Sequence, residues 1–241
     1  QTSADVAAIV DTSVATTKKI TIGQLGLALG AHALCQFRLT LTTGTPITTA
    51  DVTAAGTIYC APYKGSLIAL YDGSAQWNLY NVTEMSLALT LTSGKPYDVF
   101  CYDNSGTPTL EVLVWTNDTT RATALTTQDG IYVKTGATTR RYLGTIYASG
   151  TNTTEDSVAK RYVWNYYNRV IRYMSVVDAT NSWTYSSSTP QQANASTANQ
   201  LDYVCGVSED AVYAVVTGLG AHGTAGTGIA VGVGVDSTSS N

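Results

Sequence analysis

Three stretches of this chain carry a turn sequence between two runs of alternating apolar and polar residues, and they constrain its fold most. They are residues 66–82 with Asp72-Gly73 at the turn, residues 97–118 with Asn104-Ser105-Gly106, and residues 130–150 with Thr135-Gly136. Such turns favour β-hairpins, because their glycines adopt the backbone angles that a tight turn between two strands requires. Helical periodicity is nearly absent from the rest of the chain. We therefore expect an all-β protein made of antiparallel β-sandwich or jelly-roll-like domains.

The chain divides into three regions by composition. Residues 1–34 hold one strand-like run, "KKITI", and are too few to bury a core of their own, so we expect a short attachment segment. Residues 35–150 contain the three hairpins and predict one β domain. The polar stretch "TNTTEDSVAK" (151–160) then opens residues 151–241, which we expect to form a second β-sandwich-like domain.

The amino-acid composition limits which classes of partner the protein is expected to bind. Apolar residues make up 44% of the 241 residues, enough for a core, while charged residues make up only 12% and the net charge is −4. A general nucleic-acid binder carries a basic surplus, so no nucleic-acid partner is expected. No run reaches the roughly 18 apolar residues that span a bilayer, so no membrane insertion is expected either.

The residue types that hold metals and cofactors are sparse. The chain has two histidines, and its four cysteines, Cys35, Cys60, Cys101 and Cys205, show no Cys-x-x-Cys spacing. A zinc site needs clustered thiolates and imidazoles, so neither a metal nor a cofactor is expected. Buried thiols are a better interpretation of the four cysteines than disulfides.

No pattern identifies catalytic residues. The chain has no Gly-x-Ser-x-Gly turn for a nucleophile, and the Gly-rich "GLGAHGTAGTG" leads into a strand-like run instead of a phosphate-binding helix. Aspartates in turns ordinarily cap their own backbone. A fold can still bring two distant carboxylates together for glycoside cleavage, so a glycan-degrading activity stays open as an alternative.

Two aromatic stretches are candidates for contact with a ligand or a neighbouring subunit. The first, "KRYVWNYYNRVIRYM", contains Trp164 and Tyr166 among several arginines, and the second, "SWTYSSS", contains Trp183 and Tyr185. Aromatic rings beside arginines stack sugars or form the centres of protein interfaces. They also fill cores, so we expect these residues to make either a glycan contact or a packing contact.

The last strand-like run, "IAVGVGV", has one face almost without side chains. Ala230, Gly232 and Gly234 fall on that face, and valines and an isoleucine fall on the other. Glycine weakens a strand unless another backbone must approach it closely. We expect this face to pack against another subunit or against a second sheet of the same subunit.

The stretch "DTSVATTKKITIGQL" (11–25) resembles an element found near the N-termini of bacteriophage tail-fibre and related virion proteins. Longer stretches, such as "VFCYDNSGTPTLEVLVWTNDTTRATALTTQDGIYVKTGATTRRYLGTIY" and "EDSVAKRYVWNYYNRV", are similar to a family of uncharacterised phage and prophage virion-associated proteins. The resemblance covers roughly residues 11–205. It implies that Lys18, Lys19 and Ile20 lie at the particle-attachment end. The alternative is that the two lysines solubilise an edge strand and block its pairing.

What the resemblance implies about function agrees with the composition, which is β-forming and rich in Thr, Ser and Gly. We expect a bacteriophage virion structural protein, a tail fibre or a capsid decoration protein, which forms a homotrimer and binds other virion proteins. Its expected role is adhesion to a host-surface glycan or decoration of the particle, by binding and without catalysis. The alternatives are a fibre-borne glycan-degrading enzyme and a capsid-stabilising cement protein without a ligand.

Overall fold

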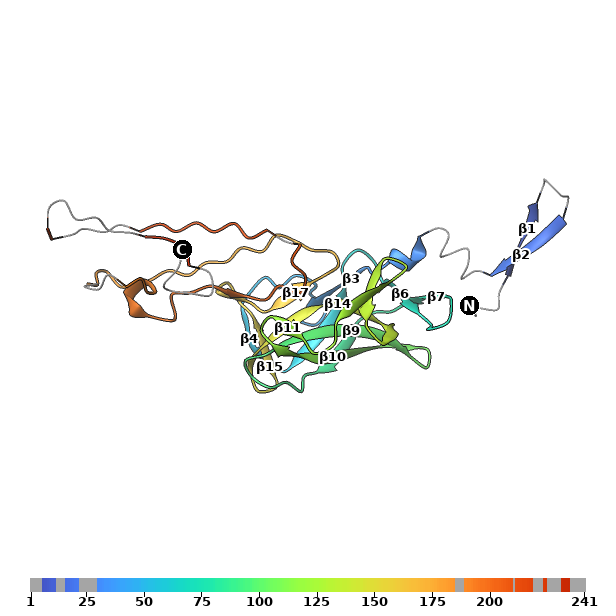
Figure 1. Ribbon diagram of the computed structural model, residues 1–241, viewed down its shortest axis with the longest axis horizontal. Helices are drawn as coiled ribbons and strands as arrows, with labels where there is room; N and C mark the ends of the chain where they lie inside the picture. The colour runs from blue at the N-terminus through green and yellow to red at the C-terminus, as the bar shows by residue number, and fades with distance from the viewer. Residues whose placement is uncertain are drawn as a thin grey trace.

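A computed structural model shows a β-structured body with a hairpin at its N-terminal side and long loops toward its C-terminus (Figure 1). The structure describes residues 30–184, 189–209, 211–218, 223–224 and 231–234, together with the backbone of residues 6–11 and 16–21. Helical structure in these residues is confined to two short 3₁₀ turns, η1 (Ala31–Ala33) and η2 (Ala193–Ala195).

The largest sheet contains most of the strands. They are β4 (Val52–Ala55), β9 (Pro96–Asn104), β10 (Thr107–Asn117), β11 (Thr120–Arg121), β12 (Leu125–Gln128), β13 (Ile131–Lys134), β14 (Ala137–Gly150), β15 (Thr153–Asp156), β16 (Lys160–Arg161), β17 (Val163–Asn165) and β18 (Asp202–Tyr203). The long β14 is central, because β9, β13, β15 and β17 all pair with it in the antiparallel sense. The short β16 and β18 pair in parallel.

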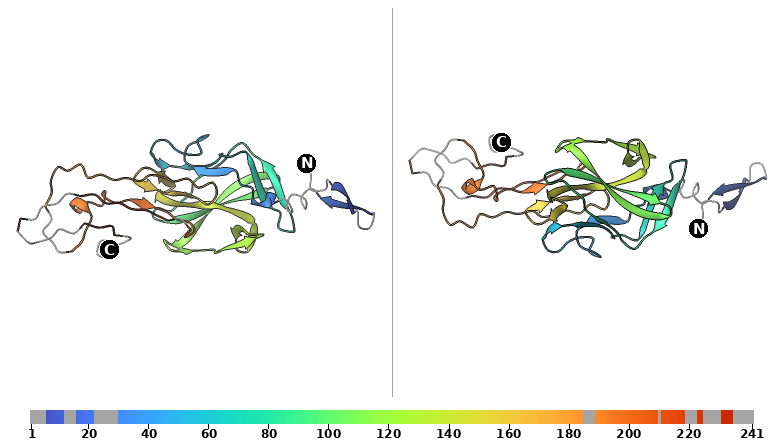
Figure 2. Two further views of the ribbon diagram at one scale, coloured as in Figure 1. Left: turned by 90° about the horizontal axis from the view of Figure 1, so that it is seen from above. Right: turned by 90° about the horizontal axis from the view of Figure 1, so that it is seen from below.

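Two smaller sheets pack against the large one. One contains β3 (Phe37–Thr40), β5 (Thr57–Pro62) and β8 (Met85–Ala88), and the other contains β6 (Leu67–Tyr71) and β7 (Trp77–Asn81). Leu39 and Ile58 from the first share one apolar core with Val99, Leu143 and Ile146 of the large sheet. Sheets that interdigitate their side chains in this way form a β-sandwich, so the expected all-β antiparallel sandwich is confirmed (Figure 2).

All three predicted hairpins form. In the first, Oδ1 of Asp72 accepts hydrogen bonds from three backbone N–H groups of the turn between β6 and β7. In the second, Asn104 pairs with Thr107 and leaves a two-residue turn in which Ser105 and Gly106 have φ of 53° and 93°. In the third, β13 and β14 meet at the predicted turn. A fourth hairpin, between β12 and β13, was not predicted.

The sheet continues across the expected domain boundary at residue 150. Strand β15 pairs with the end of β14 and also with β4, and β17 pairs with the middle of β14. Residues 153–165 therefore complete the sheet of residues 96–150, whereas we expected a second β domain to begin at 151. The reason is that β14 is long enough to pair with several partners, and the chain after its turn returns to the edges left open.

The N-terminal region forms a hairpin of its own. Strand β1 (Val6–Asp11) pairs with β2 (Thr16–Thr21) in a separate two-stranded sheet (Figure 1). The predicted strand "KKITI" overlaps β2, in which Lys18 pairs with Ile9 and Lys19 with Ala8. Residues 22–29, which follow β2, lie outside the described residues.

Beyond Asn165, the chain forms two loops that leave the body. We call the described residues of 171–201 the first loop, the described residues of 211–234 the second loop, and both together the extension. Between the two loops the chain returns to the body, where β18 pairs with β16. The described residues of the extension contain no strand, and η2 is their one helical element. A second β-sandwich over 151–241 is thus not seen in the described part of this region.

Candidate functional site

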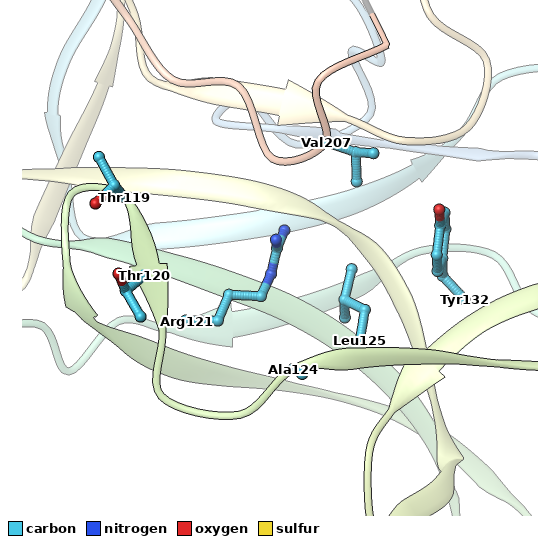
Figure 3. A pocket seen from close by; sticks show the side chains of 7 residues that line it. All are labelled: Thr119, Thr120, Arg121, Ala124, Leu125, Tyr132 and Val207. Atoms are coloured by element: carbon cyan, nitrogen blue, oxygen red, sulfur yellow. The ribbon is translucent and has the colours of Figure 1, made fainter.

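A surface cleft opens where the β11–β12 connection faces the segment that follows β18 (Figure 3). Its volume is about 420 Å³, which is within the range of small-molecule sites. Three of its lining residues carry hydroxyls, one carries a positive charge and three are apolar: Thr119, Thr120, Tyr132, Arg121, Ala124, Leu125 and Val207. The cleft thus combines hydrogen-bonding groups with aliphatic and aromatic surface.

Arg121 is held rigidly at the cleft. Its Nε donates to Oδ2 of Asp98 at 2.7 Å, and its Nη2 donates to Oδ1 of Asp98 at 3.3 Å and to the carbonyl of Gly206. The guanidinium carbon lies 4.3 Å from the ring centre of Trp115, close enough for a cation–π contact. Because the side chain is only 20% exposed, this packing fixes the edge of the guanidinium that faces the cleft.

Asp98 and its partners form a buried polar network beneath Arg121. Oδ1 of Asp98 also accepts a hydrogen bond from the Thr145 hydroxyl at 2.8 Å, and that hydroxyl lies 2.6 Å from the Tyr142 hydroxyl. Burial raises the pKa of Asp98 above its ordinary value, while the hydrogen bonds from Arg121 and Thr145 oppose the rise. Burial likewise raises the pKa of Tyr142, and the nearby charge of Asp98 adds to it. This network fixes the floor of the cleft.

An aromatic cluster stands beside the cleft and contains two residues singled out in the sequence. The rings of Tyr132 and Tyr166 meet edge to face, with centroids 5.2 Å apart. Tyr166 also contacts Trp164 at 6.2 Å and Tyr142 at 5.8 Å. Trp164 and Tyr166 are half-buried in this cluster, so they pack against the body and orient Tyr132, which itself lines the cleft.

The described lining residues do not include the carboxylate pair that glycoside cleavage uses. Glycoside cleavage uses two carboxylates that flank the bond, whereas the described residues that line this cleft include neither Asp nor Glu. Asp98 lies behind Arg121 and is 1% exposed. What the cleft offers a ligand is a fixed guanidinium edge, hydroxyl groups and apolar surface.

A second, smaller cleft of about 160 Å³ lies near Arg161 and Arg172. Both arginines are bound to one carboxylate, Asp156, with N–O distances of 3.0 and 3.2 Å. Arg161 also donates to the carbonyl of Tyr173. The arginines therefore tie the start of the first loop to the body.

The extension is the second candidate surface, because it exposes large apolar side chains. Ile171, Tyr173 and Val177 of the first loop are 102, 72 and 80% exposed. In the second loop every residue from Ala211 to Gly218 is exposed. A single copy of the chain leaves all this apolar surface in contact with water.

The remaining predicted contact residues fall partly in the extension. Trp183 lies in the first loop and is 46% exposed. Gly232 and Gly234 lie in the second loop, are exposed, and belong to no strand in the described residues. Tyr185 and Ala230 lie outside the described residues. The structure thus separates Trp164 and Tyr166, in the body, from Trp183, Gly232 and Gly234, in the extension.

The predicted attachment residues lie apart from both surfaces. Lys18, Lys19 and Ile20 are part of β2, opposite Ile9, Ala8 and Ala7 of β1. Their pairing confirms that the lysines belong to a strand. Their role in attachment to a particle stays a prediction.

Sequence reasoning did not identify the cleft. Arg121 and Tyr132 are separated from Val207 by more than seventy residues, and neither lies in a recognisable motif. One signal was available: Arg121 is the only charged residue between Asp118 and Asp129 in a chain with few charges. A lone arginine in a polar turn indicates a specific partner, but it does not identify Asp98.

Comparison of the chain with family models, with curated proteins and with solved structures found nothing similar. Among the described residues, no group of three or more His, Cys, Asp or Glu side chains is placed to hold a metal ion. The described residues also include no helix of the length and hydropathy that a transmembrane helix needs.

Proposed function

We propose that this protein is a bacteriophage virion structural protein, a tail fibre or a capsid decoration protein, that acts by binding. The observation that carries the proposal is the extension, whose exposed apolar side chains suit a subunit that assembles with others. Large exposed apolar patches mark interaction sites, and the described part of the extension exposes Ile171, Val177 and Tyr213. The sequence resemblance over residues 11–205 supplies the virion setting.

The proposed assembly is a homotrimer. Exposed apolar residues that belong to no strand in the described part of the chain line the second loop: Val212, Tyr213, Val215 and Val216. The second arm of the same loop runs close by, since a Cβ added at Gly218 would lie 3.7 Å from Val231. Identical copies can cover these segments reciprocally, because each copy brings the same exposed apolar side chains. The resemblance to fibre proteins favours three copies.

Each of the three parts of the subunit, the N-terminal hairpin, the body and the extension, has its own proposed role. The N-terminal hairpin, with Lys18 and Lys19 in β2, is proposed to contact other virion proteins. The body is proposed to present loops to the host surface, and the extension is proposed to hold the copies together. A capsid-stabilising cement protein would share the extension but would need no ligand site.

The test is whether the protein is part of a particle. Particles released by a strain that encodes the chain are purified on a density gradient and probed with an antibody against the body. We expect the protein to sediment with the particles and to be labelled on their surface in electron micrographs. Recovery of the protein only in the cell lysate, with unlabelled particles, would contradict the proposal.

A further inference from the structure

We propose that the cleft between Arg121 and Tyr132 binds a neutral saccharide. The proposal extends the proposed function, and it relies on that function only for the source of the sugar, a glycan of the host surface. Four features of the cleft lead to this ligand class: its preformed walls, its hydroxyl groups, its apolar surface and its balance of charge.

The walls of the cleft are fixed before any ligand arrives. Asn117 holds Thr119 in place. Oδ1 of Asn117 accepts hydrogen bonds from the backbone N–H and the hydroxyl of Thr119, both at 3.0 Å. On the opposite side, the Val207 carbonyl accepts a hydrogen bond from the Cys205 thiol at 3.0 Å and another from the backbone N–H of Glu209 at 2.8 Å. A preformed site binds more tightly because less side-chain freedom is lost on binding.

The hydrogen-bonding groups match a polyol. The Thr120 hydroxyl and the Tyr132 hydroxyl can each donate and accept one hydrogen bond, as sugar hydroxyls do. Nη1 of Arg121 makes no hydrogen bond to a described residue, so it adds a donor whose position is set by the ion pair with Asp98. Figure 3 shows these groups around one opening, with Arg121 between the threonines and the tyrosine.

The apolar part of the lining matches the carbon face of a sugar ring. Leu125 and Val207 supply aliphatic surface, and Tyr132 adds an aromatic ring held by Tyr166. A pyranose has C–H groups on its faces and hydroxyls at its rim, so one ring can meet both kinds of surface at once. A purely polar ion would leave the aliphatic wall unused.

The charge of the cleft selects a neutral ligand. Arg121 is the one cation among the described residues that line it, and its charge is balanced by Asp98 at 2.7 Å. A carboxylate or phosphate would have to share this guanidinium with a buried anion, which repels it. An acidic sugar is therefore expected to bind less tightly than its neutral counterpart.

The test compares sugars by saturation-transfer NMR on the full chain. The neutral probes are glucose, galactose, mannose, rhamnose and N-acetylglucosamine, and the acidic probes are glucuronate and N-acetylneuraminate. The cleft is blocked by Ala124→Arg, since Ala124 is exposed and lines it. Ala122→Arg is the matched control, because Ala122 is exposed, lies two residues away and does not line the cleft.

We expect at least one neutral sugar to bind, with its dissociation constant raised about tenfold or more by Ala124→Arg and unchanged by Ala122→Arg. Tyr132→Phe, which keeps the ring and removes the hydroxyl, is expected to weaken binding less than Ala124→Arg. Absence of binding by every neutral probe, or equal binding by the two arginine variants, would overturn the site. Stronger binding of the acidic probes would overturn the ligand class.

The outcome is separable from that of the particle test. A protein that labels particles but binds no neutral sugar would keep its virion role and lose this site. A protein that binds a neutral sugar through the cleft but is absent from particles would keep the site and lose the virion role.

Discussion

The buried side chain of Arg141 shows how one residue joins distant parts of this chain. Its Nη1 donates to the carbonyls of His32 at 2.9 Å and Ala69 at 2.7 Å, and its Nη2 donates to the carbonyl of Ala33 at 3.1 Å. Its Nε reaches the Tyr167 hydroxyl at 3.2 Å. None of these acceptors is a carboxylate, so the cation is stabilised by dipoles from three separate segments.

Replacement of Arg141 should be far more costly than replacement of its neighbour. Arg141→Met leaves three carbonyls without a donor, and each loss costs about 1–3 kcal/mol, so we expect the free energy of unfolding to fall by about 3 kcal/mol or more. Arg140→Met removes a half-exposed side chain paired with Glu111 at 3.5 Å and should cost less than about 1 kcal/mol. Chemical denaturation of both variants checks this, and equal losses would contradict it.

Two tyrosines with raised pKa values, Tyr167 beside Arg141 and Tyr80 beside Asp103, predict a pH dependence. Burial raises the pKa of Tyr167 to about 12, and it also raises that of Tyr80 to about 12. Their stabilising contribution is complete below the pKa of about 10 of an unfolded tyrosine. It is lost as the pH rises from about 10 toward 12, because the unfolded chain then releases protons that the folded chain retains.

We therefore expect tyrosine ionisation in two phases. Absorbance near 295 nm should rise first around pH 10 for exposed tyrosines, and the second phase should coincide with loss of the β-sheet circular dichroism signal. Ionisation of all 16 tyrosines in one step near pH 10, with the sheet intact, would show that the buried hydroxyls are not protected.

At the scale of elements, close packing between β14 and its neighbours requires glycine at position 144. A Cβ added to Gly144 would overlap the carbonyl oxygen of Trp164 in β17 and lie 2.9 Å from Cδ1 of Leu39. Gly56 offers a contrast, because the nearest atom to its added Cβ is the carbonyl oxygen of Asn152 at 3.8 Å. Alanine substitution at the two positions therefore distinguishes a clash with packed neighbours, expected at Gly144, from the general effect of replacing glycine, expected at Gly56.

Gly144→Ala should lower the free energy of unfolding by about 2–3 kcal/mol, since a well-packed core accepts extra atoms only by shifting strands. Gly56→Ala should leave it within about 1 kcal/mol of the natural protein. Thermal unfolding followed by circular dichroism compares the two variants. If both unfold at the same temperature, β17 does not pack on β14 as described.

The sequence predicted elements well where the information is local. The turn sequences at Asp72-Gly73 and Ser105-Gly106 predict their hairpins. Gly73, Ser105 and Gly106 have positive φ, which few residue types other than glycine adopt readily. The return of β15 and β17 to β14 was not predictable, since pairing between segments far apart depends on which edges remain open. The ion pair between Asp98 and Arg121 was not predictable either, because it joins two segments whose contact depends on how the strands pair.

At the scale of the whole molecule, the extension contains a strand-like sequence that forms no strand in one copy of the chain. Residues 211–218, "AVYAVVTG", have the β-branched and aromatic composition of a strand, yet in one copy of the chain they form none. A strand needs a partner backbone as well as suitable side chains. If other copies of the chain supply that partner, the pattern and the exposed surface have one explanation.

The same explanation predicts which substitutions separate the copies. Burial of one large apolar side chain contributes about 1.5–3 kcal/mol, so charges placed on the second loop should weaken assembly strongly. The test variant combines Tyr213→Lys and Val215→Lys, whose side chains are 91 and 72% exposed in the single copy. Its charge-matched control combines Thr92→Lys and Thr127→Lys, two exposed positions on the body.

The measurement that tests the central claim most directly is the native mass, by light scattering after size exclusion. The account predicts about 76 kDa for the natural chain and for the body control, three times the 25.4 kDa of one chain. It predicts 25.4 kDa, or a mass that falls on dilution, for the variant of the second loop. A natural chain that elutes as a 25.4 kDa monomer at every concentration would contradict it.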